Sequence, residues 1–249
     1  MKYDVKQLEL LSNDQIADGI FDMRLKLGDK LPVECGQFAH VYVPGKTLRR
    51  PISVCDASDG VLRLVYQVKG EGTRIMSQMR PGQDVDVLYP LGHGFDIEKG
   101  RRYALIGGGI GVPPMLYTAK KCDAPIAITG FRSKELVILH DDFKSAGAEV
   151  MMCTDDGSAG QKGFVTDLLR ERIDEVDEVC ACGPMPMLKA VAQVCSDAGK
   201  PCQISLEERM GCGVGACLVC AVKVRKNGQE IMQHVCKNGP VFNAEEVVF

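Results

Sequence analysis

The chain has 249 residues, 45% of them hydrophobic, and its 30 basic and 33 acidic residues leave a net charge of −3. This length and apolar content exclude a disordered chain, and charges mixed along the sequence leave no basic stripe that would bind nucleic acid. Since the amino-terminal segment lacks the apolar core of a signal peptide and no apolar run is long enough to cross a bilayer, we expect a cytoplasmic protein with no membrane partner.

Residues 1–98 are expected to form an antiparallel β-barrel, because short alternating stretches such as FDMRLKL and DVDVLYPL are separated by Gly, Pro and Asp turns. Two stretches in this part suit a flavin dinucleotide. In LRRPISV, the Arg50 guanidinium can clamp a pyrophosphate, and the nearby Ser53 hydroxyl can reach a flavin ring nitrogen. Farther on, a glycine turn leads through Gly72 and Thr73 into a short helix whose amino end suits phosphate oxygens. Thr73 is equally an ordinary helix cap, so only the two stretches together favour a flavin.

Residues 99–205 alternate strand, glycine turn and helix, which predicts a parallel sheet covered by helices. The run GGGIGVPP follows a strand and opens a helix, as a diphosphate-binding turn does, although its glycines do not have the Rossmann spacing. A simple tight turn is the alternative. A second strand ends in CGP at the same edge of the sheet, where dinucleotides bind, although its cysteine also fits a strand-end core position. The candidate contacts to NAD are Gly108, Gly109, Gly111, Cys182, Gly183 and Pro184.

Residues 206–249 gather cysteines with the pattern C-x4-C-x2-C-x15-C, formed by Cys212, Cys217, Cys220 and Cys236. An interval of four and then two residues is the plant-type pattern for thiolates that hold a 2Fe-2S cluster. The glycines among the first ligands allow tight turns that aim amide hydrogens at sulfur. A structural zinc site is the alternative, but it usually takes two closely spaced ligand pairs. After the third cysteine we expect a hairpin that turns at Asn227 and Gly228.

The stretches RPIS, GEGT, GGGIGVPPML and CGPMPML and the cysteine set, in this order over nearly the whole chain, resemble the ferredoxin reductase superfamily. The cysteine-bearing tail, which ends CKNGPVF, is more closely similar to the electron transfer subunits of class 1B dihydroorotate dehydrogenases. The resemblance implies FAD on the barrel, NAD on the parallel-sheet domain and a 2Fe-2S cluster in the tail. It also implies a catalytic partner subunit that carries FMN and oxidises dihydroorotate to orotate, in a heterotetramer with two copies of each subunit.

Matched residue by residue, the resemblance implies two sets of contacts. The FAD contacts are Arg50, Pro51, Ile52, Ser53, Val65, Tyr66, Gln67, Gly72 and Thr73, and the cluster ligands are Cys212, Cys217, Cys220 and Cys236. The chain departs from the superfamily at Ile52, where an aromatic residue is usual, so stacking on the flavin ring is lost there.

The function expected from this pattern is electron transfer to NAD+ in pyrimidine biosynthesis, with the flavin converting between hydride and single electrons and no catalytic side chain required. Three alternatives stay open. One is the small subunit of a bifurcating NADH-dependent ferredoxin:NADP oxidoreductase, which an aspartate among the cluster ligands would have favoured. The others are a self-sufficient NADH:acceptor reductase and a non-enzymatic ferredoxin-like carrier.

Overall fold

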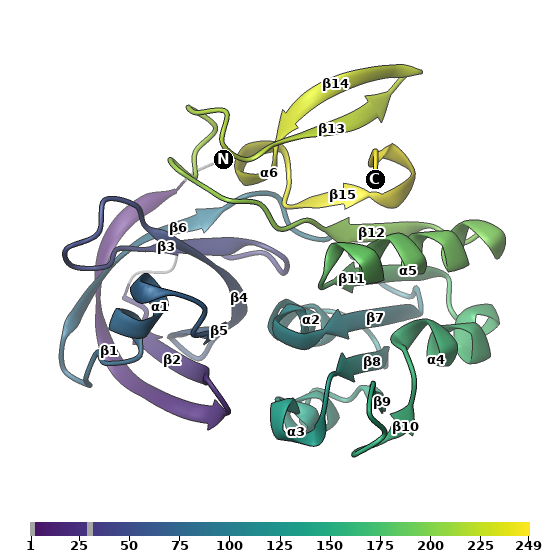
Figure 1. The fold of residues 1–249 in the computed structure, drawn as a ribbon, viewed down its shortest axis with the longest axis horizontal. Helices are drawn as coiled ribbons and strands as arrows, with labels where there is room; N and C mark the ends of the chain where they lie inside the picture. Colours follow the sequence, from purple (N-terminus) through teal and green to yellow (C-terminus); the bar gives the residue numbers. More distant parts are fainter. Residues whose placement is uncertain (1–2, 29–31) are drawn as a thin grey trace.

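The computed structural model describes residues 3–28 and 32–249 and consists of three parts (Figure 1). A barrel built from the amino-terminal residues lies beside a sheet covered by helices, and the carboxy-terminal residues, drawn in yellow, lie across one end of both. No helix in the described part of the chain is long and apolar enough to span a membrane.

The barrel is closed and antiparallel, with the strand order β1-β2-β5-β4-β3-β6. Its strands are β1 (Asp4–Ala17), β2 (Ile20–Lys26), β3 (Phe38–Val41), β4 (Arg50–Ser58), β5 (Val61–Gln67) and β6 (Asp84–Leu91), and the short helix α1 (Glu71–Met76) follows β5. Alternate residues such as Leu62 and Leu64 point inward and are fully buried, while the residue between them is only partly buried. This alternation is the pattern that predicts the strands from the sequence, and the expected barrel is confirmed.

The second part is a seven-stranded sheet with the order β10-β9-β8-β7-β11-β12-β15. Its strands are β7 (Tyr103–Gly108), β8 (Ile126–Phe131), β9 (Glu149–Thr154), β10 (Gln161–Lys162), β11 (Glu178–Cys182), β12 (Cys202–Ser205) and β15 (Val241–Asn243). The α-helices between them are α2 (Val112–Ala119), α3 (His140–Ser145), α4 (Val165–Arg172) and α5 (Met185–Asp197), and short 3₁₀ turns span Gly109–Gly111, Lys134–Leu136, Ile173–Glu175 and Ala244–Glu246.

All strands of this sheet are parallel except β15, which pairs antiparallel with β12. The sheet grows outward in both directions from β7 and β11, which lie side by side although β8, β9 and β10 come between them in the chain. The carboxyl ends of these two strands therefore form the switch point at which open parallel sheets bind dinucleotides.

The tail forms a small unit that is tied back to the sheet. Strands β13 (Ala221–Lys226) and β14 (Gln229–His234) form the expected hairpin, with positive φ angles of 52° at Asn227 and 76° at Gly228. The short helix α6 (Val235–Asn238) then leads into β15. The boundary of this unit at residue 206 remains a prediction. Its last strand, β15, belongs to the seven-stranded sheet, where it pairs with β12.

Partly buried ion pairs join the barrel to the second part. Arg63 on β5 pairs with Asp22 on the neighbouring strand β2 and with Asp142 on α3. Lys120, directly after α2, pairs with Asp56 on β4. The two parts are therefore held together by charge as well as by the packing of α2 on the barrel.

Candidate cofactor site

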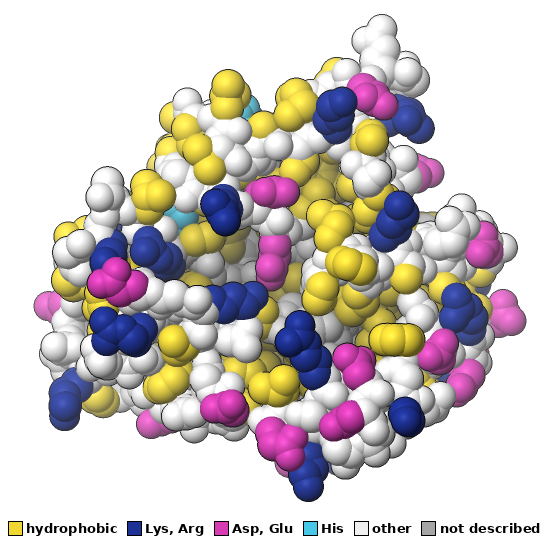
Figure 2. Space-filling view, viewed as in Figure 1, with side chains coloured by type: hydrophobic (Ala, Val, Ile, Leu, Met, Phe, Trp, Pro, Cys, Tyr) yellow, Lys and Arg dark blue, Asp and Glu magenta, His cyan; other side chains and the backbone are white. Residues whose placement is uncertain are grey.

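A cavity of about 220 Å³ lies where the barrel, the sheet and the tail meet. In Figure 2 hydrophobic side chains border the hollow in the middle of the molecule, together with acidic and basic ones. The cavity is lined by Phe38, Pro51, Ile52, Ser53, Val65, Tyr66, Gln67, Lys69, Thr73, Ile110, Ser205, Leu206, Glu207, Glu208, Met210 and Pro240. The structure thus brings together all the residues expected to contact FAD except Arg50 and Gly72, which lie beside the cavity. Apolar walls with a few polar groups suit a flat heteroaromatic ring.

Arg50 and Gly72 are packed against each other. A Cβ at position 72 would lie 2.2 Å from Nε and 2.5 Å from Cζ of Arg50, so only glycine leaves room for the guanidinium above the start of α1. The guanidinium donates a hydrogen bond to the Leu48 carbonyl oxygen and forms no salt bridge with any described residue. A cation held at the start of a helix without an acidic partner fits the diphosphate of a dinucleotide.

Thr73 and Tyr66 line the cavity, but their hydroxyl groups have partners elsewhere. Thr73 Oγ1 accepts hydrogen bonds from the main-chain N–H groups of Lys69 at 3.0 Å and Gly70 at 3.2 Å. Tyr66 donates its hydroxyl proton to Asn13 at 3.0 Å, and burial raises the pKa of the phenol. The hydroxyl of Thr73 therefore closes the turn before α1, as the cap alternative expects, and that of Tyr66 helps to fix the barrel wall.

The glycine run after β7 packs against the end of β11. A Cβ at Gly111 would lie 2.3 Å from the Cys182 carbonyl oxygen, and a Cβ at Gly108 would lie 2.3 Å from the sulfur of Met187. Gly111 is therefore required by the close approach of the turn to the strand end, whereas at Gly108 the flexible side chain of Met187 on α5 could move aside. Gly109 differs, because its φ is +53° and nothing lies within 4 Å of where its Cβ would be. It is the glycine of the run whose backbone is open to a ligand.

Cys182 and Gly183 lie at the carboxyl end of the central strand β11, beside this turn. The thiol is buried, and burial, with a contribution from Glu207, raises the pKa of Cys182 to about 12. Cys182 is therefore a neutral thiol at physiological pH. Both readings of this residue, a contact to nicotinamide and a core position at the strand end, are compatible with this environment.

The four cysteines of the tail approach one another in two pairs. Cys220 and Cys236 are buried with their sulfur atoms 3.3 Å apart, while the Cys217 amide N–H points at the sulfur of Cys212 at 3.4 Å. No three His, Cys, Asp or Glu side chains in the described ranges gather around one point as the ligands of a single ion would. Two pairs of thiolates are the donor set of a 2Fe-2S cluster, in which each iron takes two cysteines.

Amide hydrogens converge on these sulfur atoms. Val214 and Ala216 donate to Cys212 at 3.5 and 3.2 Å, and Gly215 donates to Cys236 at 3.2 Å. Partial burial of Cys212 opposes ionisation, but the amide donors outweigh it and lower the pKa of this thiol to about 6. The loop turns through the left-handed region at Gly213 and Gly215, as the glycines led us to expect. A loop that stabilises the Cys212 thiolate fits the proposed cluster, whereas burial, with a contribution from Cys220, raises the pKa of Cys236 to about 12.

Several residues of the site escape sequence reasoning. Ser205 to Met210, which connect β12 to the cysteine loop, form one wall of the cavity, and Phe38 and Pro240 form others. His40 on β3 lies fully buried against Gly213 of the cysteine loop. Apart from Pro240, which lies in the CKNGPVF stretch, these positions belong to no motif of the sequence, and they are found only because distant segments meet in the fold.

A second hollow, of about 340 Å³, lies near the amino ends of β7 and β9. Its two arginines already have acidic partners. Arg101 pairs with Glu98 and Glu178, and Arg102 with Glu149. This hollow lies at the amino ends of the strands, opposite the carboxyl ends where the glycine turn lies, and both of its arginines are already paired with acidic residues.

The chain is similar to several known proteins. Residues 207–248 match the family model described as the iron-sulfur cluster binding domain of dihydroorotate dehydrogenase B. A protein of Caldanaerobacter subterraneus subsp. tengcongensis called "Dihydroorotate dehydrogenase B (NAD(+)), electron transfer subunit" is 44% identical over 250 residues, which cover 100% of both chains. A protein of the same description from Geobacillus sp. is 43% identical and covers 98% of each chain.

The chain is also similar to a solved structure, that of an NADH-dependent reduced ferredoxin-NADP oxidoreductase studied for flavin-based electron bifurcation. The two chains are 31% identical with a TM-score of 0.86, over 98% of this chain and 90% of that one.

Proposed function

Because the chain belongs to the family of dihydroorotate dehydrogenase B (NAD(+)) electron transfer subunits, we propose that it serves a catalytic subunit carrying FMN. Electrons from dihydroorotate oxidation would then pass through a 2Fe-2S cluster and FAD to NAD+ in pyrimidine biosynthesis. The observation that carries this proposal is the meeting of three features at one place: the paired cysteines, the cavity at the barrel wall, and the glycine turn at the sheet edge.

Each cofactor has its own set of proposed contacts. FAD would contact Arg50, Pro51, Ile52, Ser53, Val65, Tyr66, Gln67, Gly72 and Thr73; NAD would contact Gly108, Gly109, Gly111, Cys182, Gly183 and Pro184; the cluster would be held by Cys212, Cys217, Cys220 and Cys236. When bound, FAD exchanges hydride with nicotinamide and also gives or takes single electrons, which are all that the cluster carries.

The protein's own residues bind, orient and exclude water. Arg50, held over Gly72, balances the diphosphate charge, and Ile52 and Val65 form an apolar floor. The buried pair Cys220 and Cys236 keeps water from the inner side of the cluster site. No side chain needs to act as an acid or base on dihydroorotate, since that chemistry belongs to the catalytic subunit.

An exposed apolar surface beside the cysteines is suited to the partner. Leu218 is 78% exposed and Val219 55% exposed, and both lie between the second and third cysteines. Apolar side chains this exposed are more stable when covered by another protein. We therefore propose that the catalytic subunit docks here, in a cytoplasmic heterotetramer with two copies of each subunit.

The second candidate function is that of the small subunit of a bifurcating reductase, which the similarity to the solved structure favours. The curated relatives are more similar in sequence, at 43 and 44% identity. All four proposed ligands are cysteines here, which also favours the dihydroorotate dehydrogenase reading.

A paired assay tests the proposed function. The purified chain is mixed with the FMN-bearing catalytic subunit, and NADH formation from dihydroorotate is compared with NADH oxidation by a two-electron dye. We expect the variant Cys220→Ala to keep the dye reaction and to lose the coupled reaction. A matched control, Cys122→Ala, removes a thiol outside the site and should keep both.

Two results would count against the proposal. Loss of both activities with FAD still bound would show that the cluster is not a separate exit for electrons. Retention of both would place the contact of the partner at the flavin itself. Reduction of ferredoxin by the parent chain with a different partner, without coupling to dihydroorotate, would support the bifurcating reductase instead.

A further inference from the structure

His40 is the side chain in the described part of the structure for which both ring nitrogens are buried without a hydrogen-bond partner. Its exposed fraction is 0%. A buried polar atom normally has a partner, since leaving it unpaired costs about 1 to 3 kcal/mol. The ring therefore faces a group that the protein chain alone does not supply.

The position of His40 shows where that group lies. Its ring packs edge-on against Phe38 at 6.1 Å, and its cross-strand neighbour is Pro51; both of these residues line the flavin cavity. On the other side, a Cβ at Gly213 would lie 2.6 Å from His40 Nδ1. Gly213 directly follows Cys212, so the imidazole lies between the cavity wall and the cysteine loop.

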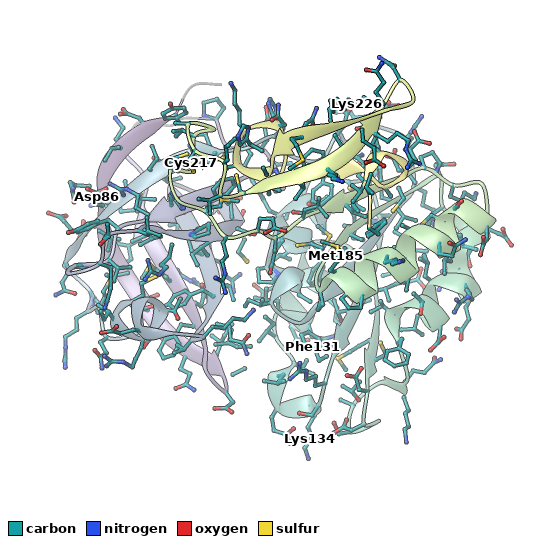
Figure 3. All side chains as sticks on the ribbon, turned by 45° about the horizontal axis from the view of Figure 1, so that its top comes forward. Asp86, Phe131, Lys134, Met185, Cys217 and Lys226 are labelled. Atoms are coloured by element: carbon teal, nitrogen blue, oxygen red, sulfur yellow. The ribbon has the colours of Figure 1, made fainter. Side chains whose placement is uncertain are left out.

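The views of the whole molecule agree with this placement. In Figure 3 the loop that bears Cys217 passes over the end of the barrel at which β3 and β6 lie. Gly213 requires a φ of +74° and the absence of a side chain, which together let the loop approach the ring closely. The contact therefore depends on two residues, Gly213 on the loop and the buried His40 on the barrel.

The surroundings of the ring also fix its charge. Arg49 donates hydrogen bonds to the His40 carbonyl oxygen at 3.3 Å and to Asp86 at 2.7 Å, which anchors this part of β3 to β6. Burial, and then the positive charges of Arg49 and Arg50, lower the pKa of His40 to about 4. The ring is therefore a neutral imidazole, with one N–H to donate.

We propose that His40 is a positioning residue that donates its ring N–H to a sulfur atom of the iron-sulfur site and so fixes the cysteine loop on the flavin-bearing barrel. This inference rests on the proposed cluster ligands. A hydrogen bond to a cluster or ligand sulfur stabilises the extra negative charge of the reduced state, so it raises the reduction potential of the cluster. His40 would thus link the geometry of the loop to the potential of the cluster.

Three substitutions test this role in the full-length chain. His40→Leu removes the donor, His40→Asn keeps a donor close to the position of Nδ1, and His40→Gln keeps one close to that of Nε2. The measurements are the iron and FAD content per chain and the reduction potential of the cluster, followed by EPR during a redox titration. Leu88→Ala is the control for packing, because Leu88 is the neighbour of His40 on β6 and neither donates a hydrogen bond nor lines the cavity.

We expect His40→Leu to shift the cluster potential to a more negative value or to lose iron, and one of the two amide variants to restore it. The amide that restores the potential identifies the donating nitrogen. The inference would be overturned if the cluster in His40→Leu kept the potential of the parent. It would also be overturned if neither His40→Asn nor His40→Gln differed in potential from His40→Leu. A parent chain without a cluster signal would instead refute the proposed function, so the two failures are distinguishable.

Discussion

Replacing Gly72 with alanine should release FAD while leaving the fold intact. The new Cβ would lie 2.2 Å from Nε of Arg50, far inside the range of non-bonded contact. The atoms in its way are the far end of a flexible side chain, so the guanidinium can swing aside at little cost to folding. The position of that guanidinium at the proposed diphosphate site would be lost.

The expected size of the effect follows from the interaction that is removed. A hydrogen bond to a charged group contributes about 1.5 to 3 kcal/mol, which corresponds to a roughly 10- to 150-fold weaker flavin affinity. Arg50→Ala should weaken binding by a similar factor. Because both substitutions remove the same contact, the double variant should bind FAD little worse than either single variant.

The assay is titration of the flavin-free chain with FAD, followed by quenching of flavin fluorescence, with urea unfolding measured in parallel. Gly70→Ala is a matched control from the same turn, since the backbone there is extended and nothing lies within 4 Å of the new Cβ. The reasoning would be refuted if Gly72→Ala bound FAD as tightly as the parent. Additive losses in the double variant would refute it as well, because they would show that Gly72 acts independently of Arg50.

Three further predictions follow from the rest of the structure. Arg63→Met should lower the free energy of unfolding by about 1 to 3 kcal/mol, because it leaves the buried carboxylate of Asp22 with only the half-exposed Arg24 as a partner; an unchanged urea midpoint would contradict this. Cys217→Ser should reduce iron and sulfide content towards background with FAD retained, as measured by chemical analysis, and unchanged iron would exclude this residue as a ligand. Leu218→Asp should weaken association with the catalytic subunit by about tenfold or more without affecting dye reduction, and parental behaviour in sedimentation would place the interface elsewhere.

Local patterns in the sequence predict much of the fold. The barrel strands follow from alternation, and the parallel sheet from its sequence of strand, glycine turn and helix. The spacing of the cysteines predicts their convergence, since three of the four lie on one short loop and the hairpin between Cys220 and Cys236 returns the chain to it. In each case the interactions that decide the structure lie close together in the sequence.

The remaining features depend on contacts between distant segments. The need for glycine at position 111 comes from the carbonyl oxygen of Cys182, seventy-one positions away, rather than from the turn itself. In the same way the tail strand β15 extends the sheet beside β12, and His40 becomes significant only because Gly213 lies on it. Sequence periodicity carries no information on such pairs, so these features had to be found in the folded chain.

The anchoring of the tail explains how the cysteine loop is held near the flavin cavity. The main-chain N–H of Leu206 donates to the carbonyl oxygen of Pro240 at 2.9 Å, and that of His93 donates to Gly239 at 2.6 Å. The first bond continues the pairing of β12 with β15, and the second ties the tail to the end of the barrel. Main-chain bonds on both sides leave the loop little freedom to move relative to either part.

This arrangement has a functional consequence for the proposed electron path. Electron transfer between two centres requires a constant separation, and backbone hydrogen bonds give a more constant separation than contacts between flexible side chains. The cysteine loop itself has few large apolar residues with which to form a core, and its Leu218 and Val219 are largely exposed. Its position therefore comes from the anchored segment around Cys236, through the bonds Gly215 N–H to Cys236 sulfur and Val235 N–H to the Cys220 carbonyl oxygen, and from the contact of Gly213 with His40. Because the loop is held on the side of Gly213, its exposed residues Leu218 and Val219 remain free to contact the proposed catalytic subunit.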